Sequence, residues 1–189
     1  MAYRRGFKSE ANATAHEIRD ELGLGDLDRL DPIELAAHLL VPIQTLTELA
    51  ARSEEATAYL LAEEPSSFSA VTVFHGSRRL IVHNDAHHPY RQNSNIAHEL
   101  SHALLFHEPM PALDNHGSRY WNQDIEDEAN WLAGVLLMTE DATLYVVRRA
   151  WSMERIGEQF GISAQMATWR INSTGARKRV AGGPHLTLG

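Results

Sequence analysis

The sequence predicts an α+β fold that is mainly helical, with a small antiparallel sheet packed on one central helix and a helical pair near the C-terminus. Apolar residues recur at helical spacing in most segments, most clearly over residues 91–107 and 124–138. Residues 68–82 instead alternate and are β-branched, as half-buried strands are. With 189 residues, 43% of them hydrophobic, the chain can bury a substantial core.

The first 60 residues predict helices separated by short breaks. An amphipathic helix over residues 9–22 ends at Gly23. Asp31 then has the position of an N-cap and Pro32 that of the first helical residue, so a second helix is expected to run to Leu40. Two short elements follow, an extended segment at 41–43 and a helical turn at 46–52.

The middle of the chain predicts a β-hairpin and two strong helices. Residues 68–74 and 79–82 are the two strands of the hairpin. A histidine-rich loop at 84–89 leads into the helix 91–107, which prolines end. After a further loop, the second strong helix covers 124–138.

Composition limits the classes of function. The net charge of -8 argues against a protein that coats nucleic acid or an anionic membrane with its whole surface. The chain has no cysteine, so any metal must be held by nitrogen and oxygen ligands. The N-terminal residues lack the apolar core of a signal peptide, and no apolar run is long enough to span a bilayer, which predicts a cytoplasmic protein.

The motif His98-Glu-Leu-Ser-His102 carries the predicted chemistry, and most of the 11 histidines lie around it, between His75 and His116. On a helix, His98 and His102 lie about 40° apart around the axis and about 6 Å apart along it, so both imidazoles can bind one zinc ion. Glu99 cannot be a third ligand from its position, but it can reach a water on that zinc and act as the general base. The apolar surroundings of the motif predict a buried helix, in which such polar groups need partners or a metal.

The third metal ligand is expected from the helix 124–138, because a catalytic zinc normally has three protein ligands and one open position. Glu128 is preferred, since helical rotation places it toward the edge shared with Leu132 and Val135. Glu126 is the alternative and falls nearer the opposite edge.

At these residues the sequence resembles the ImmA/IrrE family of zinc metallopeptidases. The resemblance rests on two segments, Ala97-His-Glu-Leu-Ser-His-Ala-Leu-Leu105 and Glu128-Ala-Asn-Trp-Leu-Ala-Gly-Val-Leu-Leu-Met138. It implies a gluzincin-like site with His98, His102 and Glu128 as ligands and Glu99 as base. It also implies a protein substrate, a helix-turn-helix repressor in phage, mobile-element or stress regulation. The chain has Ser101 where the family often has glycine, and Thr139 where it often has proline.

A peptidase usually needs a further donor to stabilise the oxyanion that forms on the substrate. Loop residues near the motif helix are candidates, with Tyr90, His116 and Tyr120 first and His87 and His88 also considered. The outer strand of the hairpin is a candidate for holding an extended substrate by strand addition.

The C-terminal region opens an alternative function. Residues 151–175, which follow a metallopeptidase domain at 1–150, resemble a helix-turn-helix with Ser163 as N-cap of the second helix. Arg170 and a basic tail at 176–189, expected to be flexible, would help DNA contact. The alternative is a regulatory protein-binding or DNA-binding module whose zinc site is structural or vestigial. Packing is the preferred role of the helical pair, because direct readout of bases requires polar side chains.

Overall fold

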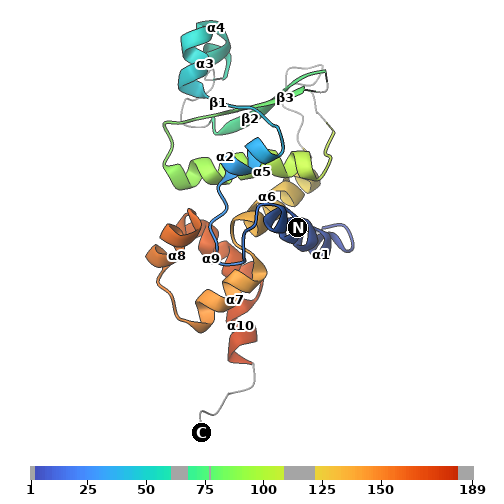
Figure 1. The fold of residues 1–189 in the computed structure, drawn as a ribbon, viewed down its shortest axis with the longest axis vertical. Coiled ribbons are helices and arrows are strands. Elements are labelled where there is room, and N and C mark those ends of the chain that lie inside the picture. Colours follow the sequence, from blue (N-terminus) through green and yellow to red (C-terminus); the bar gives the residue numbers. More distant parts are fainter. Residues whose placement is uncertain (1–2, 61–67, 77, 109–121, 183–189) are drawn as a thin grey trace.

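The computed structural model describes residues 3–60, 68–76, 78–108 and 122–182 (Figure 1). Its elements in chain order are α1 (Phe7–Glu21), α2 (Pro32–His38), β1 (Ile43–Thr45), α3 (Leu46–Arg52), α4 (Glu54–Leu60), β2 (Ala70–His75), β3 (Arg78–His83), α5 (Pro89–Leu104), α6 (Gln123–Leu137), α7 (Glu140–Arg148), α8 (Met153–Phe160), α9 (Ala164–Ser173) and α10 (Ala176–Ala181). The predicted class, mainly helical α+β, is confirmed.

The sheet has three strands in the order β1-β3-β2, and it lies between α3 on one face and α5 on the other (Figure 1). The predicted hairpin is β2 and β3, which pair antiparallel with Thr72 opposite Ile81. β1 adds a parallel strand beside β3, so the sheet is mixed. The alternation of the strands places Ile81 in the core on the α5 side and Val82 in a smaller apolar cluster on the α3 side.

The main core begins at the sheet and continues through the helices below it. α6 lies between α5 and α1, and the C-terminal helices α7 to α10 gather at the far end of α6 (Figure 1). A single cluster of buried apolar residues includes Phe7 of α1, Leu100 of α5, Leu132 of α6 and Ile171 of α9. The boundaries 1–150 and 151–175 stay a prediction, since the described helices of both segments contribute to this cluster.

Side-chain caps explain where several helices begin. Asp31 accepts a hydrogen bond from the Ile33 amide, with Pro32 at the first helical position, as predicted. Ser163 caps α9 by accepting from the Met166 amide, which confirms the second predicted cap. Thr139 caps α7, a helix that the sequence analysis did not predict, by accepting from the Ala142 amide.

One predicted boundary was wrong, and part of the tail that was expected to be flexible is helical. The helix that carries the motif ends at Leu104 and not at His107, because Phe106 adopts a left-handed conformation with φ of 54° and turns the chain out of the helix. The segment 176–189, expected to be flexible, begins as the helix α10 and buries Ala176 in the core. Residues 183–189 lie outside the described part of the chain.

Candidate metal centre

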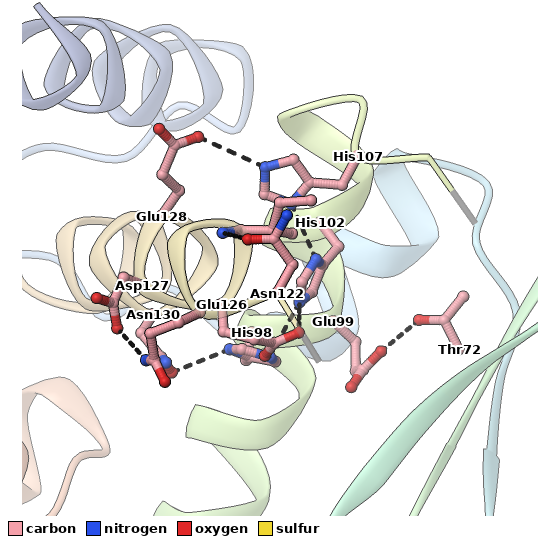
Figure 2. A network of polar contacts seen from close by, with 12 residues as sticks. Thr72, His98, Glu99, His102, His107, Asn122, Glu126, Asp127, Glu128 and Asn130 are labelled. Atoms are coloured by element: carbon pink, nitrogen blue, oxygen red, sulfur yellow. Dashed lines mark hydrogen bonds and ion pairs between the residues drawn. The ribbon is translucent and has the colours of Figure 1, made fainter. Parts of the chain in front are cut away.

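Helix α5 presents both histidines of the motif to α6. The opposite side of α5 is fixed in the core by Ile96, Ala97 and Leu100, each 1% exposed or less. The Nε2 atoms of His98 and His102 lie 3.0 Å apart, and the two rings meet edge to face (Figure 2). Two nitrogens that bind one tetrahedral zinc at about 2.05 Å are separated by about 3.3 Å, so this spacing fits a shared ion.

Helix α6 brings Glu126 to the same point (Figure 2). One carboxylate oxygen lies 3.2 Å from His98 Nε2 and the other lies 3.7 Å from His102 Nε2. The ligand atoms of these three side chains all lie within 4.8 Å of one another. Two imidazoles and one carboxylate are a donor set of the kind that holds catalytic zinc in proteins, so the residues present fit this metal.

The charges in the cluster favour a cation at its centre. Burial opposes ionisation of Glu126, but hydrogen bonds from His102 and His98 outweigh it and hold the pKa of Glu126 at about 2. Burial also lowers the pKa of His98, whereas contacts with Glu126, Glu99 and Asn130 raise it above its ordinary value, and the net change is upward. Without a metal, the positive charge that the Glu126 carboxylate attracts is therefore that of His98 protonated on Nε2.

Asn130 orients the first histidine. Its Oδ1 lies 3.0 Å from His98 Nδ1 and accepts the proton on that nitrogen (Figure 2). The contact leaves Nε2 as the atom directed at Glu126 and His102, which is the role that outer partners of histidine ligands have. Asn130 was not predicted from the sequence, although its position four residues after Glu126 places both on one face of the helix and could have indicated it.

Glu99 lies beside the cluster but faces the sheet. Its carboxylate accepts a hydrogen bond from Thr72 Oγ1 at 2.5 Å, and Thr72 belongs to β2 (Figure 2). Since Glu99 follows His98 directly, its side chain leaves α5 about 100° away from the metal-binding face. Glu99 therefore lies between the cluster and the outer strand of the sheet, and Thr72 is a further residue that the sequence did not reveal.

The structure does not bring Glu128 to the histidine pair, and the preference for this residue is corrected. Glu128 lies on another side of α6, where Arg4 Nε and His107 Nε2 approach its two oxygens at 3.1 and 3.6 Å. Rotation on the helix could not decide between the two glutamates, because α6 is buried from Leu132 to Leu137 on every side. We therefore replace Glu128 by Glu126 as the candidate third ligand.

His107 reaches the cluster from outside the helix, a position that the sequence did not predict. Its Nδ1 lies 2.9 Å from His102 Nδ1. Burial and the neighbouring His102 lower the pKa of His107, against the opposing effect of Glu128. His107 thus contacts the side of His102 that faces away from His98 and Glu126 (Figure 2).

Among the described residues, the candidates for stabilising the oxyanion do not lie at the metal cluster. Tyr90 lies eight residues before His98 on the same helix, about 12 Å along its axis, and its ring lies against Gly157 of α8. His88 is the N-cap of α5, where its Nδ1 accepts from the Tyr90 amide. His116 and Tyr120 lie outside the described residues.

The C-terminal helices are occupied with packing. Arg170, a candidate for DNA contact, has no exposed surface, and its Nε donates to the carbonyl oxygen of Met138 at 3.0 Å. Trp169 packs edge to face on Trp131 of α6. These contacts favour the packing role expected for Trp169.

Comparisons with known proteins agree with the site. The family model of Peptidase_M78, described as the IrrE N-terminal-like domain, matches residues 61–172, which include α5 and α6. None of the curated proteins matches the chain. None of the helices in the described part of the chain is both long and apolar enough to cross a membrane. With more than half of its length matched, and with the histidine–glutamate cluster inside the matched region, the chain belongs to the IrrE N-terminal-like family of metallopeptidase domains.

Proposed function

We propose that the protein is a zinc-dependent endopeptidase whose metal is held by His98, His102 and Glu126. One observation carries the proposal, namely that two imidazole nitrogens and a carboxylate converge within 4.8 Å. Glu99 stands one residue from the first ligand with its carboxylate turned toward the sheet. A structural zinc site needs no general base, so the presence of Glu99 favours catalysis over a structural or vestigial metal.

Zinc bound at these three side chains would polarise a substrate carbonyl and lower the pKa of a coordinated water. Glu99 is the proton acceptor on the protein side and passes that proton to the leaving amine. The hydroxyl of Thr72 donates to the Glu99 carboxylate and so limits the rotation of its side chain. Asn130 holds His98 with its Nε2 directed at the metal position.

The outer edge of β2 is our candidate for holding the substrate. β2 is an edge strand of the three-stranded sheet among the described residues. The Asn84 amide donates to the Ser69 carbonyl at 2.9 Å, so every second residue from Ser69 bonds to β3 and the backbone groups of Thr72 are directed at the outer edge. An extended peptide added there would run past Glu99, the neighbour of Thr72.

The substrate that we propose is a protein, and the family resemblance points to a helix-turn-helix repressor. No contact among the described residues favours the alternative function of DNA binding. Arg170 of α9 is buried, and its Nε donates to the Met138 carbonyl at the end of α6. Lys178 and Arg177 remain exposed on α10, but this helix is only six residues long.

The proposal is tested with purified protein and Glu99→Gln. The wild type is loaded with zinc and incubated with helix-turn-helix repressors and with an unfolded general substrate, and cleavage is followed by mass spectrometry. We expect cleavage that a chelator removes and zinc restores, and we expect Glu99→Gln to bind zinc with a rate lower by about 10²- to 10⁴-fold. Full activity of Glu99→Gln, or no zinc binding by the wild type, would overturn the proposal.

A further inference from the structure

We infer that His107 and Glu128 form a positioning chain that holds the ring of His102, so that its Nε2 is directed at the metal. The chain starts at Glu128, continues through His107 and ends at His102 (Figure 2). This inference rests on the proposed function, because it assumes that His102 binds the metal through Nε2. It gives a role to Glu128, the residue that the sequence suggested as a ligand.

With a neutral His107, one distribution of protons satisfies the whole chain. A carboxylate can only accept, so the proton of His107 belongs on Nε2, the nitrogen that lies 3.6 Å from Glu128. The Nδ1 of His107 is then an acceptor, and it takes the proton of His102 Nδ1 across 2.9 Å. His102 Nε2 is left with a lone pair, directed at His98 and Glu126.

The same distances exclude His107 as a ligand of the shared ion. His107 approaches His102 on the Nδ1 side, whereas His98 and Glu126 approach on the Nε2 side. An imidazole carries its two nitrogens on different sides of the ring, so one ion cannot bind His102 Nε2 and also His107. His102 and His98 are therefore matched, since each has an acceptor on Nδ1, His107 for one and Asn130 for the other.

The backbone turn after α5 places His107 beside His102. Phe106 is left-handed with φ of 54°, its amide donates to the Ala103 carbonyl, and the His107 amide donates to the His102 carbonyl at 3.0 Å. This pair of bonds is a Schellman motif, which closes a helix and reverses the chain. A phenylalanine in this conformation costs about 1 kcal/mol, and its side chain lies 86% exposed, so packing of Phe106 does not explain the turn.

The far end of the chain is held by the N-terminal segment. Arg4 Nε lies 3.1 Å from one oxygen of Glu128, and its two terminal nitrogens donate to Glu10 at 2.6 and 2.8 Å. Glu128 and His107 are largely buried, with side chains 13% and 10% exposed. Arg4 is half exposed, so solvent weakens its contribution, and the inner pair is expected to dominate.

The first measurement is the tautomer of His102 by ¹⁵N NMR of the histidine side chains, with and without zinc. We expect the proton on Nδ1 in the wild type both with and without zinc, and a loss of this preference in zinc-free His107→Leu. His107→Asn supplies a side-chain oxygen like that of Asn130 and should restore it. A proton on His102 Nε2 in the zinc-free wild type would overturn the inference, as would an unchanged tautomer in zinc-free His107→Leu.

The second measurement is the zinc dissociation constant by competition with a chelating dye. Loss of an outer partner weakens metal binding by about 10- to 100-fold, which is our expectation for His107→Leu, with a smaller loss for Glu128→Gln. The matched control is Glu17→Gln, which changes an exposed acid of α1 that has no part in the chain and should leave zinc affinity unchanged. Recovery in His107→Asn separates positioning from a loss of folding.

The two proposals fail differently. If the wild type cleaves proteins with zinc while His107→Leu binds zinc with unchanged affinity, the positioning chain is wrong and the proposed function stands. If the wild type binds zinc without cleaving any protein, the peptidase function fails while the tautomer and affinity measurements still decide the positioning chain.

Discussion

The two ends of α6 both bury charged groups, but they use them in different ways. At the first end, Glu126 and Asn130 contact the two ring nitrogens of His98 on α5. At the other end, Arg19 donates to the carbonyl of Leu136 at 2.7 Å and Arg170 donates to that of Met138 at 3.0 Å. Glu126 lies near the positive end of the α6 dipole, and the two arginines lie near its negative end.

The difference teaches how a buried charge can be assigned a role. Both terminal nitrogens of Arg19 have backbone partners, since Arg19 also donates to the carbonyls of Gly25 and Asp28. A group satisfied by backbone carbonyls caps and ties elements together, so its purpose is structural. The cluster around Glu126 instead holds acceptor atoms that face one another, which is favourable only with a proton or a metal between them.

The largest expected effect is on metal binding, and it comes from a change to Glu126 at the first end of α6. Glu126→Ala removes one of three proposed ligands, so we expect the zinc dissociation constant to rise by about 100- to 1,000-fold. Asp124→Asn, an exposed acid in the same first turn, is the control and should change little. Zinc titration of both variants by calorimetry checks this, and equal affinities would assign the third ligand elsewhere.

At the second end the same kind of change should affect stability and not zinc binding. Arg19→Met leaves three backbone carbonyls without their donor, so we expect the free energy of unfolding to fall by about 3 kcal/mol. Urea unfolding measures the loss, with the exposed Arg5→Met as control. A fall in zinc affinity without a fall in stability would contradict the structural role.

The pH dependence of the metal-free protein tests the charges at the first end. The raised pKa of His98 means that its stabilising charge is complete below its ordinary value of 6.5 and is lost as pH rises through the folded value. The lowered pKa of Glu126, about 2 against an ordinary 4.5, gives stability that is complete above 4.5 and lost as pH falls toward 2.

Thermal unfolding in chelator should therefore show a melting temperature a few degrees higher near pH 5.5 than near pH 8. Glu126→Gln should reduce this difference, because His98 loses the carboxylate that raises its pKa. A difference of the same size in Glu126→Gln would show that the titrating groups lie outside the cluster.

The smallest expected effect is on stability, and it comes from Phe106 in the turn that ends α5. Phe106→Gly places the residue that favours φ of 54° at this position, so stability should rise by about 0.5–1 kcal/mol. The exposed ring loses little packing, and His107 should keep its place beside His102. Unfolding of the variant gives the energy, and the NMR signals of the histidines report the position.

Local patterns were sufficient for much of the fold. The caps at Asp31 and Ser163 and the alternating hairpin depend on neighbours in sequence, so these predictions were confirmed. α7 was not predicted, although Thr139 is a good N-cap. α10 was missed because a run of basic residues carries no clear apolar face.

The sequence by itself determined the motif helix, the residues of its metal-binding face and the family to which the chain belongs. The helical spacing of four residues fixes His98 and His102 relative to one another in any fold that forms the helix.

Only the tertiary structure decided which glutamate meets them and where His107 lies. α6 is apolar on all sides over its second half, and at Gly134 the ring of Trp169 approaches so closely that an added Cβ would lie 2.3 Å from it. Periodicity identifies the apolar face of a helix, but a helix buried all round has no such face. The contacts of α6 with α5, α1 and α9 therefore set its rotation, and with it the choice of Glu126.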